Sequence, residues 1–342
     1  MRDRIFNAGL ALLVCCSAGC FGVDPNDRLA WEALVEISRP ADAGGALDNE
    51  TRVTWRLWAT KEEIYPVGDN LTPSIPPSGI NAGFTRLHCG ISAQQQMFSA
   101  AQHENGSDGA APCEAIFLNQ PATQYMLANR IYLRGPMISL ASTGGIHLPS
   151  GQNGPNVARE IKTEWRPISA SQSGRYVVAM SDSSKAGPYG LVAIHLMTHE
   201  AADWVWATWI HEDFAKDVQL RDSFGRVKDG KISPALGQLL KNANEPFLEH
   251  YRLIGTQSDF KPKSLGNPQI ERGMNLKCSS CMGCHRYAAV TGSGGWQPLS
   301  PCKMVGVVPP PAGMHPTDFD YTLTREPECH GAAQCQTALE VR

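Results

Sequence analysis

The sequence predicts an α+β fold, with a β-rich region over residues 20–230 followed by a helical region over 231–342 that packs on it. Short apolar segments rich in β-branched and aromatic residues recur up to residue 210, and helical spacing replaces them after Ser233. A targeting segment precedes both regions. Its removal leaves roughly 320 residues, which is enough for one large or two smaller domains.

The targeting segment covers residues 1–19. Arg2 and Arg4 give it a positive start, and residues 5–14 form an almost unbroken apolar run. That run is too short to cross a bilayer, so it predicts a signal peptide rather than a membrane span. No later part of the sequence has a long uncharged apolar run, so we expect no other span.

Residues 17–20 resemble a bacterial lipoprotein cleavage site, because small residues precede Cys20. Ser17 departs from the pattern, which more often has Leu there. The resemblance implies that Cys20 is lipidated and holds the protein at the periplasmic face of a membrane. Phe21, in place of Asp, favours the outer membrane. A plain signal peptide cleaved near the same point is the alternative.

The charge of the chain excludes one class of partner. The formal net charge is −3 and the sequence contains no basic tract. Nucleic acids are bound mainly through clustered Lys and Arg side chains, so a nucleic-acid partner is not expected.

The β-rich region begins with a helix. Residues 26–39 place apolar side chains at helical spacing, with Asn26 or Asp27 as the cap. Residues 52–60 alternate like a strand, and residues 124–133 fit a strand or a helix equally well. Four strands are then predicted, over residues 158–167, 176–180, 190–196 and 204–210.

Helical patterns dominate the last third. Ser233 and Pro234 have the residue types of an N-cap and a first helical position, and helical spacing follows up to Pro246. Further helical pieces are predicted over 246–251, 269–274 and 286–290. Residues 293–314 are rich in Pro and Gly and predict an irregular segment.

The last third contains one motif of reactive residues, Cys281-Met282-Gly283-Cys284-His285. It has the C-x-x-C-H pattern of c-type haem attachment. Two thiols at this spacing each add to one vinyl group of the same haem. The histidine that follows then offers its imidazole to the iron. The motif therefore predicts one haem c, bound through Cys281 and Cys284, with His285 as the proximal ligand.

The same cysteines also fit another kind of site. With Cys278 before the motif and Cys302 as a remote fourth ligand, they have the composition of a zinc or iron–sulfur module. A bacterial ferredoxin run would place a fourth cysteine at the position of Ala288, so that run is incomplete. Zinc knuckles separate their ligand pairs by a loop, whereas this stretch is contiguous.

The remaining cysteines suit an oxidising compartment. Of eleven cysteines, six remain after the signal peptide, Cys20 and the motif are set aside. An even remainder predicts up to three disulfides, and six cysteines allow fifteen pairings. Proximity favours Cys89 with Cys113 and Cys329 with Cys335, which leaves Cys278 with Cys302. Free buried thiols are the alternative.

The sequence does not determine which residue would bind the haem iron on the side opposite His285. A methionine would suit an electron carrier of raised potential, and a histidine would lower the potential. Met314 follows a Pro-rich loop that could deliver it, and Met304 lies nearby. His195 and His211 lie on predicted strands. Each of these is as readily explained by a structural role.

Three blocks of the sequence resemble an uncharacterised family of bacterial single-haem c-type cytochrome proteins. They are residues 190–213 with the WVWAT core at 204–208, residues 251–257, and residues 265–285 ending in SSCMGCH, with 162–165 and 318–321 as further similarities. The resemblance covers roughly residues 155–325. It implies a haem and an export route, and it draws attention to His195 and His211. The chain departs from the family at Trp209 and Ile210, where the family shows Phe-Glu.

The sequence therefore predicts an exported, lipid-anchored cytochrome that transfers electrons to a partner the sequence does not identify. Three basic residues near the motif are candidate partners of the haem propionates: Arg272, Lys277 and Arg286. Trp204, Trp206 and Trp209 fit a core or haem-packing role. The alternative is a haem enzyme or sensor with an open distal site, in which His199, Glu200 or Glu212 serves as an acid–base group.

Overall fold

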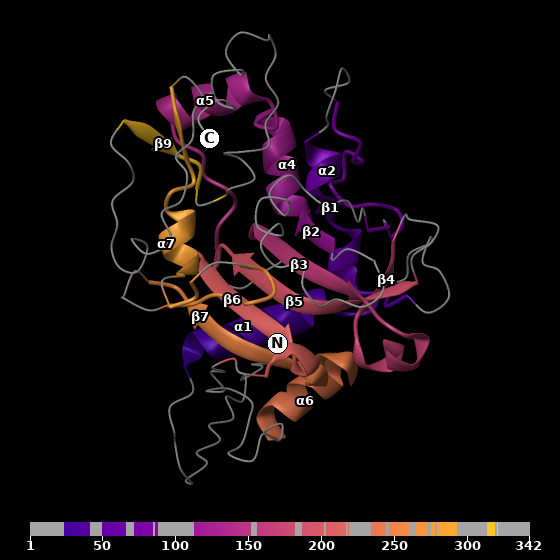
Figure 1. Ribbon diagram of the computed structural model, residues 1–342. Coiled ribbons are helices and arrows are strands. Elements are labelled where there is room, and N and C mark those ends of the chain that lie inside the picture. The colour runs from indigo at the N-terminus through magenta and orange to yellow at the C-terminus, as the bar shows by residue number, and fades with distance from the viewer. Residues whose placement is uncertain are drawn as a thin grey trace, which may run out of the picture.

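A seven-stranded antiparallel sheet forms the centre of the molecule (Figure 1). The computed structural model describes residues 24–41, 50–65, 72–84, 86–87, 113–151, 156–181, 187–201, 203–216, 218, 234–243, 246–259, 264–271, 275–277, 279–292, 313–318 and 320. The strand order is β1-β2-β3-β5-β6-β7, and β4 pairs with β5 beside this path. The strands are β1 (Ala59–Thr60), β2 (Cys113–Leu118), β3 (Arg159–Pro167), β4 (Val178–Met180), β5 (Pro188–Thr198), β6 (Val205–His211) and β7 (Tyr251–Gln257).

Helices cover both faces of this sheet. The α-helices are α1 (Pro25–Ile37), α2 (Lys61–Ile64), α4 (Gln120–Ala128), α5 (Arg134–Thr143), α6 (Pro234–Ala243) and α7 (Cys281–His285). Four 3₁₀ turns join them: η1 (Thr54–Leu57), η2 (Ala170–Arg175), η3 (Glu212–Phe214) and η4 (Pro246–His250). A small ribbon pairs β8 (Ala289–Thr291) with β9 (Met314–Pro316).

The first face of the sheet packs against α1 and α6. Trp31 of α1 meets Trp209 of β6 edge to face, with ring centroids 5.7 Å apart, and both side chains are buried. Thr256 of β7 donates a hydrogen bond of 2.5 Å to the buried carboxylate of Asp27 in the first turn of α1. The long apolar stripe of α1 thus packs on the part of the sheet formed by β6 and β7.

The opposite face carries α4, α5 and α7. Met126, Met137, Met197, Trp206 and Ile254 share one core with Cys281 and Met282 of α7. Because side chains alternate along a strand, Trp206 and Ile254 point to this face while their neighbours Ala207 and Leu253 point to the face of α1. The cysteine motif therefore packs on the sheet itself.

The prediction of a helical C-terminal third was wrong. Among the described residues of that third, β7 joins the main sheet beside β6, and α7 is a single helical turn followed by β8. Leu253, Ile254 and Thr256 suit a half-buried strand, and pairing with β6 gives their backbone groups hydrogen-bond partners. Over the residues that the structure describes, the fold is rich in sheet and has few helices.

Several single elements agree with their predictions. The helix predicted over 26–39 is α1, although Asp24 caps it. The strands predicted over 158–167, 176–180, 190–196 and 204–210 correspond to β3, β4, β5 and β6, and the helix after Pro234 is α6. Two predictions fail: residues 54–57 form a 3₁₀ turn before the short β1, and the helix expected over 286–290 is replaced by β8.

Candidate functional site

The helical turn α7 is held in place from its first residue. Ser280 caps it by accepting a hydrogen bond from the Gly283 backbone N–H, 3.1 Å long. Gln257, at the end of β7, contacts the Ser280 hydroxyl and accepts a hydrogen bond of 3.1 Å from the Met282 N–H. A side chain of the sheet edge thereby fixes both the start and the orientation of the turn.

This turn brings the two cysteines together. Cys281 and Cys284 are three residues apart on one helix, so their side chains lie on the same side of it. Neither forms a disulfide. Cys281 is 9% exposed, Cys284 and His285 are half-buried, and Met282 between them is fully buried in the core. Burial raises the pKa of the Cys284 thiol to about 12.

His285 packs against the sheet through Trp206. The two ring centroids lie 4.3 Å apart at an angle of 51°. Trp206 is followed by Trp204 at 6.4 Å, and the Trp204 ring stacks on His199 at 4.3 Å. A continuous row of aromatic rings thus runs from His285 across the end of β6.

The backbone at Trp204 is strained. Its φ of 65° lies in the left-handed region, which a bulky residue adopts only where its surroundings enforce it. His199 stacks on its indole, and His199 Nδ1 donates a hydrogen bond of 2.9 Å to the Leu148 carbonyl. Asp318 accepts a hydrogen bond of 2.6 Å from the Leu148 N–H. Through Leu148 and His199, these contacts connect Asp318 with Trp204 at the start of β6.

A short segment, residues 264–271, crosses the sheet beside α7. At its start the Leu265 N–H donates to the Ser279 carbonyl at 2.8 Å, and a Cβ on Gly266 would come within 2.8 Å of Ser279 Oγ, so the approach requires glycine. In its middle the buried Asn267 side chain donates to Thr208 Oγ1 and the Trp209 carbonyl, at 2.9 and 2.8 Å. The segment is therefore fixed to both α7 and β6.

At the end of this segment Glu271 pairs with His195 of β5. The distance between Glu271 Oε1 and His195 Nε2 is 2.6 Å. Burial alone would raise the pKa of Glu271, but the His195 ring, the Asn267 N–H and Lys162 outweigh it, so the pKa lies below its usual value. The carboxylate is thus charged at neutral pH, and its charge adds to the raised pKa of Cys284.

The comparisons with known proteins identify no relative. No family model, no curated protein and no solved structure matches this chain. The resemblance to single-haem cytochromes therefore depends only on the residue blocks quoted above, and the function has to be argued from the site.

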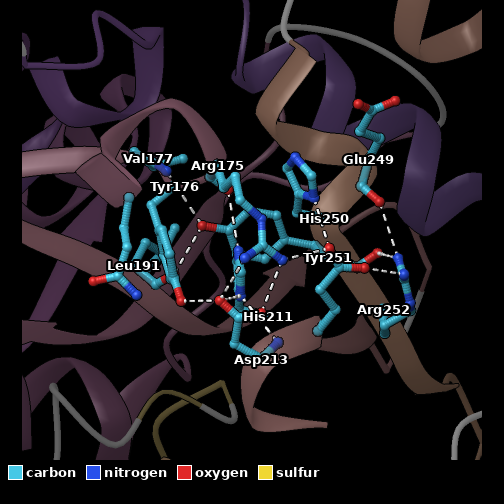
Figure 2. A network of polar contacts seen from close by, with 12 residues as sticks. Arg175, Tyr176, Val177, Leu191, His211, Asp213, Glu249, His250, Tyr251 and Arg252 are labelled. Carbon is cyan, nitrogen blue, oxygen red and sulfur yellow. Dashed lines mark hydrogen bonds and ion pairs between the residues drawn. The ribbon is translucent and has the colours of Figure 1, made fainter. Parts of the chain in front are cut away.

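His211 lies in a separate polar network at the other end of β6 (Figure 2). Its ring stacks on Tyr176 at 3.8 Å, Nε2 donates to the Arg175 carbonyl at 3.1 Å, and Nδ1 accepts from the Asp213 N–H at 3.2 Å. Burial lowers the pKa of His211 to about 4. Both ring nitrogens are engaged in one neutral tautomer, so His211 has a structural role here.

The network around His211 joins three 3₁₀ turns. The Glu212 carboxylate of η3 accepts hydrogen bonds from Arg175 of η2, His250 of η4 and Arg252 of β7. Burial alone would raise the pKa of Glu212, and these donors outweigh it, so the pKa is lowered. Glu212 is thereby occupied far from α7, and Glu200 similarly pairs with Arg159 at 2.9 Å.

Met314 lies in the ribbon that follows the motif. β9 pairs with β8, and Met314 of β9 lies opposite Thr291 of β8. Thr291 comes six residues after His285 in the sequence. α5 packs against both strands of the ribbon. Met314 is half-buried, so it remains a candidate ligand on placement alone.

The other predicted site residues are distributed as follows. Lys277 is exposed and Arg286 is half-buried. Cys113 is disulfide-bonded, and its partner is outside the described residues. The remaining predicted residues also lie outside them: Cys20, Cys89, Arg272, Cys278, Cys302, Met304, Cys329 and Cys335.

The described residues contain no group of three His, Cys, Asp or Glu side chains placed to hold a metal ion. None of their helices combines the length and the apolar character needed to cross a bilayer. The zinc or iron–sulfur alternative depends on Cys278 and Cys302, which lie outside the described residues.

Sequence reasoning missed the residues that support the site. Gln257, Asn267 and Glu271 are ordinary polar residues in the sequence, and only the fold brings them beside α7. Ser280 could have been found, because a serine before a short helical stretch is a common N-cap.

Proposed function

We propose that this chain is an exported c-type cytochrome with one covalently bound haem, which transfers electrons in the periplasm. The observation that carries the proposal is α7, where two thiols share one side of a single helical turn and a histidine follows. Both the spacing and the side-chain chemistry suit haem attachment. When bound, the haem supplies one-electron oxidation and reduction at its iron.

The residues of the chain would hold this group against the sheet. Cys281 and Cys284 would form the two thioethers, and His285 would supply the proximal nitrogen. Trp206 fixes the plane of the His285 ring, and Gln257 with Ser280 prevents α7 from turning. A rigid frame of this kind suits electron transfer, because little rearrangement accompanies a change in iron charge.

Removal of the cysteines tests the proposal. The protein is produced in a host that attaches haem c, denatured, and stained for haem after electrophoresis. We expect stain on the wild type and on Met282→Leu, which keeps the motif and nearly keeps the core volume. We expect none on the double variant Cys281→Ser, Cys284→Ser. A wild-type chain without covalent haem would overturn the proposal, and bound zinc in its place would favour the alternative module.

Carbon monoxide distinguishes the carrier from a haem enzyme or sensor. An electron carrier with both axial positions filled binds the gas slowly or not at all in its reduced form. We therefore expect little change in the reduced absorption spectrum on addition of carbon monoxide. Rapid, complete binding would instead favour an enzyme or sensor with an open distal position.

We also propose a lipid anchor on Cys20 that holds the protein at the periplasmic face of the outer membrane. The residue pattern at 17–20 supports it. The Cys20→Ala variant should lose label from radioactive palmitate and leave the membrane fraction. Cys15→Ala is the matched control, because that cysteine lies in the same signal peptide but outside the cleavage site. Equal labelling of Cys20→Ala and wild type would contradict the anchor.

A further inference from the structure

We propose, on the basis of the haem attachment proposed above, that His195 is the second axial ligand and that Glu271 is its positioning residue. The proposal depends on how the sheet and the 264–271 segment bring these two side chains to the face that carries α7. It also selects between the three distal candidates that the sequence left open.

The position of His195 on β5 is the first step. His195 pairs with Thr208 of β6, so Trp206 is its diagonal neighbour on the same face of the sheet. Such neighbours have their Cα atoms about 7–8 Å apart. Since the Trp206 ring contacts the His285 ring, His195 and His285 both lie beside Trp206 on the face of the sheet that carries α7.

The pairing of His195 with Glu271 is the second step. The Glu271 carboxylate lies 2.6 Å from Nε2 and accepts a hydrogen bond from its N–H, which leaves the lone pair on the other ring nitrogen. Histidines that bind metals commonly donate their second ring N–H to a carboxylate, which fixes the tautomer and raises the basicity of the ligand. Glu271 is held in turn by the Asn267 N–H, at 2.5 Å.

The segment that carries Glu271 is the third step. Residues 264–271 touch α7 at Leu265 and Ser279, and Cys281 Sγ lies 3.9 Å from the Leu265 carbonyl. One short stretch of chain thus connects the cysteines of the motif with the side chain that contacts His195.

The two rivals are less well placed. His211 is five residues from Trp206 along β6, about 16 Å away by strand geometry, and both of its ring nitrogens are hydrogen-bonded. Met314 has a suitable sulfur and lies near α7 in the ribbon, but no described contact orients its side chain toward the sheet. Asp213 also lies 3.6 Å from Nδ1 of His211, but that nitrogen already accepts the Asp213 N–H. The contact of His195 with Glu271 uses Nε2 and leaves Nδ1 for a metal.

His195→Gly tests the ligand. In the purified holoprotein, we expect the variant to keep its covalent haem, to change from a low-spin to a high-spin absorption spectrum, and to bind carbon monoxide when reduced. Added imidazole should restore the low-spin spectrum, because it replaces the missing ring. Restoration also shows that the variant is folded around its haem.

Met314→Leu and His211→Gln provide the comparison. Both should retain the wild-type low-spin spectrum and should not respond to imidazole. A wild-type spectrum in His195→Gly, or loss of the low-spin spectrum in Met314→Leu, overturns this inference but leaves the haem attachment in place. Absence of haem from every variant and from wild type overturns the proposed function instead.

Glu271→Gln tests the positioning role. The amide can still accept the hydrogen bond but carries no charge, so the His195 ring becomes a weaker donor to ferric iron. We expect the low-spin spectrum to persist and the reduction potential to rise. Glu62→Gln, on α2 beside the opposite edge of the sheet, makes the same charge change and should leave the potential near the wild-type value. Equal potentials in wild type and Glu271→Gln overturn the positioning role.

Discussion

The Ser280 side chain makes two kinds of contact. Its hydroxyl caps α7 at Gly283 and exchanges hydrogen bonds with the Gln257 amide, at 3.0 and 3.2 Å. Both Ser280 and Gln257 are buried, so a lost partner would not be replaced by water. A single hydroxyl therefore determines how firmly the cysteine motif is joined to the sheet.

Ser280→Ala should lower the free energy of unfolding by about 1–2 kcal/mol, because the cap is lost and the Gln257 amide is left short of a partner. Urea titration followed by tryptophan fluorescence measures this value. Ser280→Thr keeps the hydroxyl and should lose less than half as much. An equal loss in both variants would show that shape, and not the hydrogen bonds, is responsible.

The buried His211 makes stability depend on pH. Its pKa is about 4 in the folded protein, against about 6.5 in an unfolded chain, because burial disfavours the charged ring. The unfolded state therefore binds the extra proton between these values. Stability is fully present above pH 6.5 and falls as the pH decreases toward 4, by at most about 3 kcal/mol for this residue.

His211→Gln cannot bind that proton. Urea midpoints at pH 7 and pH 5 should differ less in the variant than in wild type, even if the variant is less stable at both. The same comparison between pH 7 and pH 8 is the control, because there His211 is neutral in both states and the two slopes should agree. Identical slopes between pH 5 and pH 7 would contradict the assignment.

At the scale of elements, strands are predicted most accurately from the sequence where most of their residues are buried. Residues 159–167 and 205–211 alternate or run apolar, and both are central strands. The apolar pattern does not predict the strand at residues 251–257, because the pattern there is short. That strand forms through its pairing with β6. The pattern fails again at 286–290, because the backbone after α7 pairs with β9, which is distant in sequence.

The 264–271 segment has no regular secondary structure, so its position depends on side chains. Asn267→Ala removes two buried hydrogen bonds to β6 and should cost about 2–3 kcal/mol. Hydrogen exchange should become faster at residues 265–271 than at residues in β3. Ser264→Ala, in the same segment but exposed, is the control and should have a small effect. Uniformly faster exchange across the sheet would mean a global effect rather than a local one.

At the scale of the molecule, one sheet joins the early and late parts of the chain. β7 and α6 come after residue 230, yet they complete the core around Trp31 and Trp209. The sequence could not predict this shared core. The change from strand-like to helical patterns after residue 230 looks like a boundary between two separately packed regions. The motif itself was readable, whereas its attachment to the sheet through Gln257 was not.

A chain ending at residue 230 should therefore not fold. It would leave the β6 edge unpaired and Trp209 exposed to water, and both are buried in the whole protein. Near-ultraviolet circular dichroism should show no fixed tryptophan environment in this fragment. The chain 24–342 is the control and should retain its tertiary signal. A fragment with a cooperative unfolding transition would contradict a single shared core.

The burial of Cys281 has a consequence for how the protein matures. Its sulfur is packed beneath the Leu265 carbonyl, and Met282 next to it is fully enclosed. The haem attachment proposed above requires that both thiols be accessible. On that proposal, attachment would have to precede docking of α7 onto β7, because a chain that folded first would keep Cys281 enclosed.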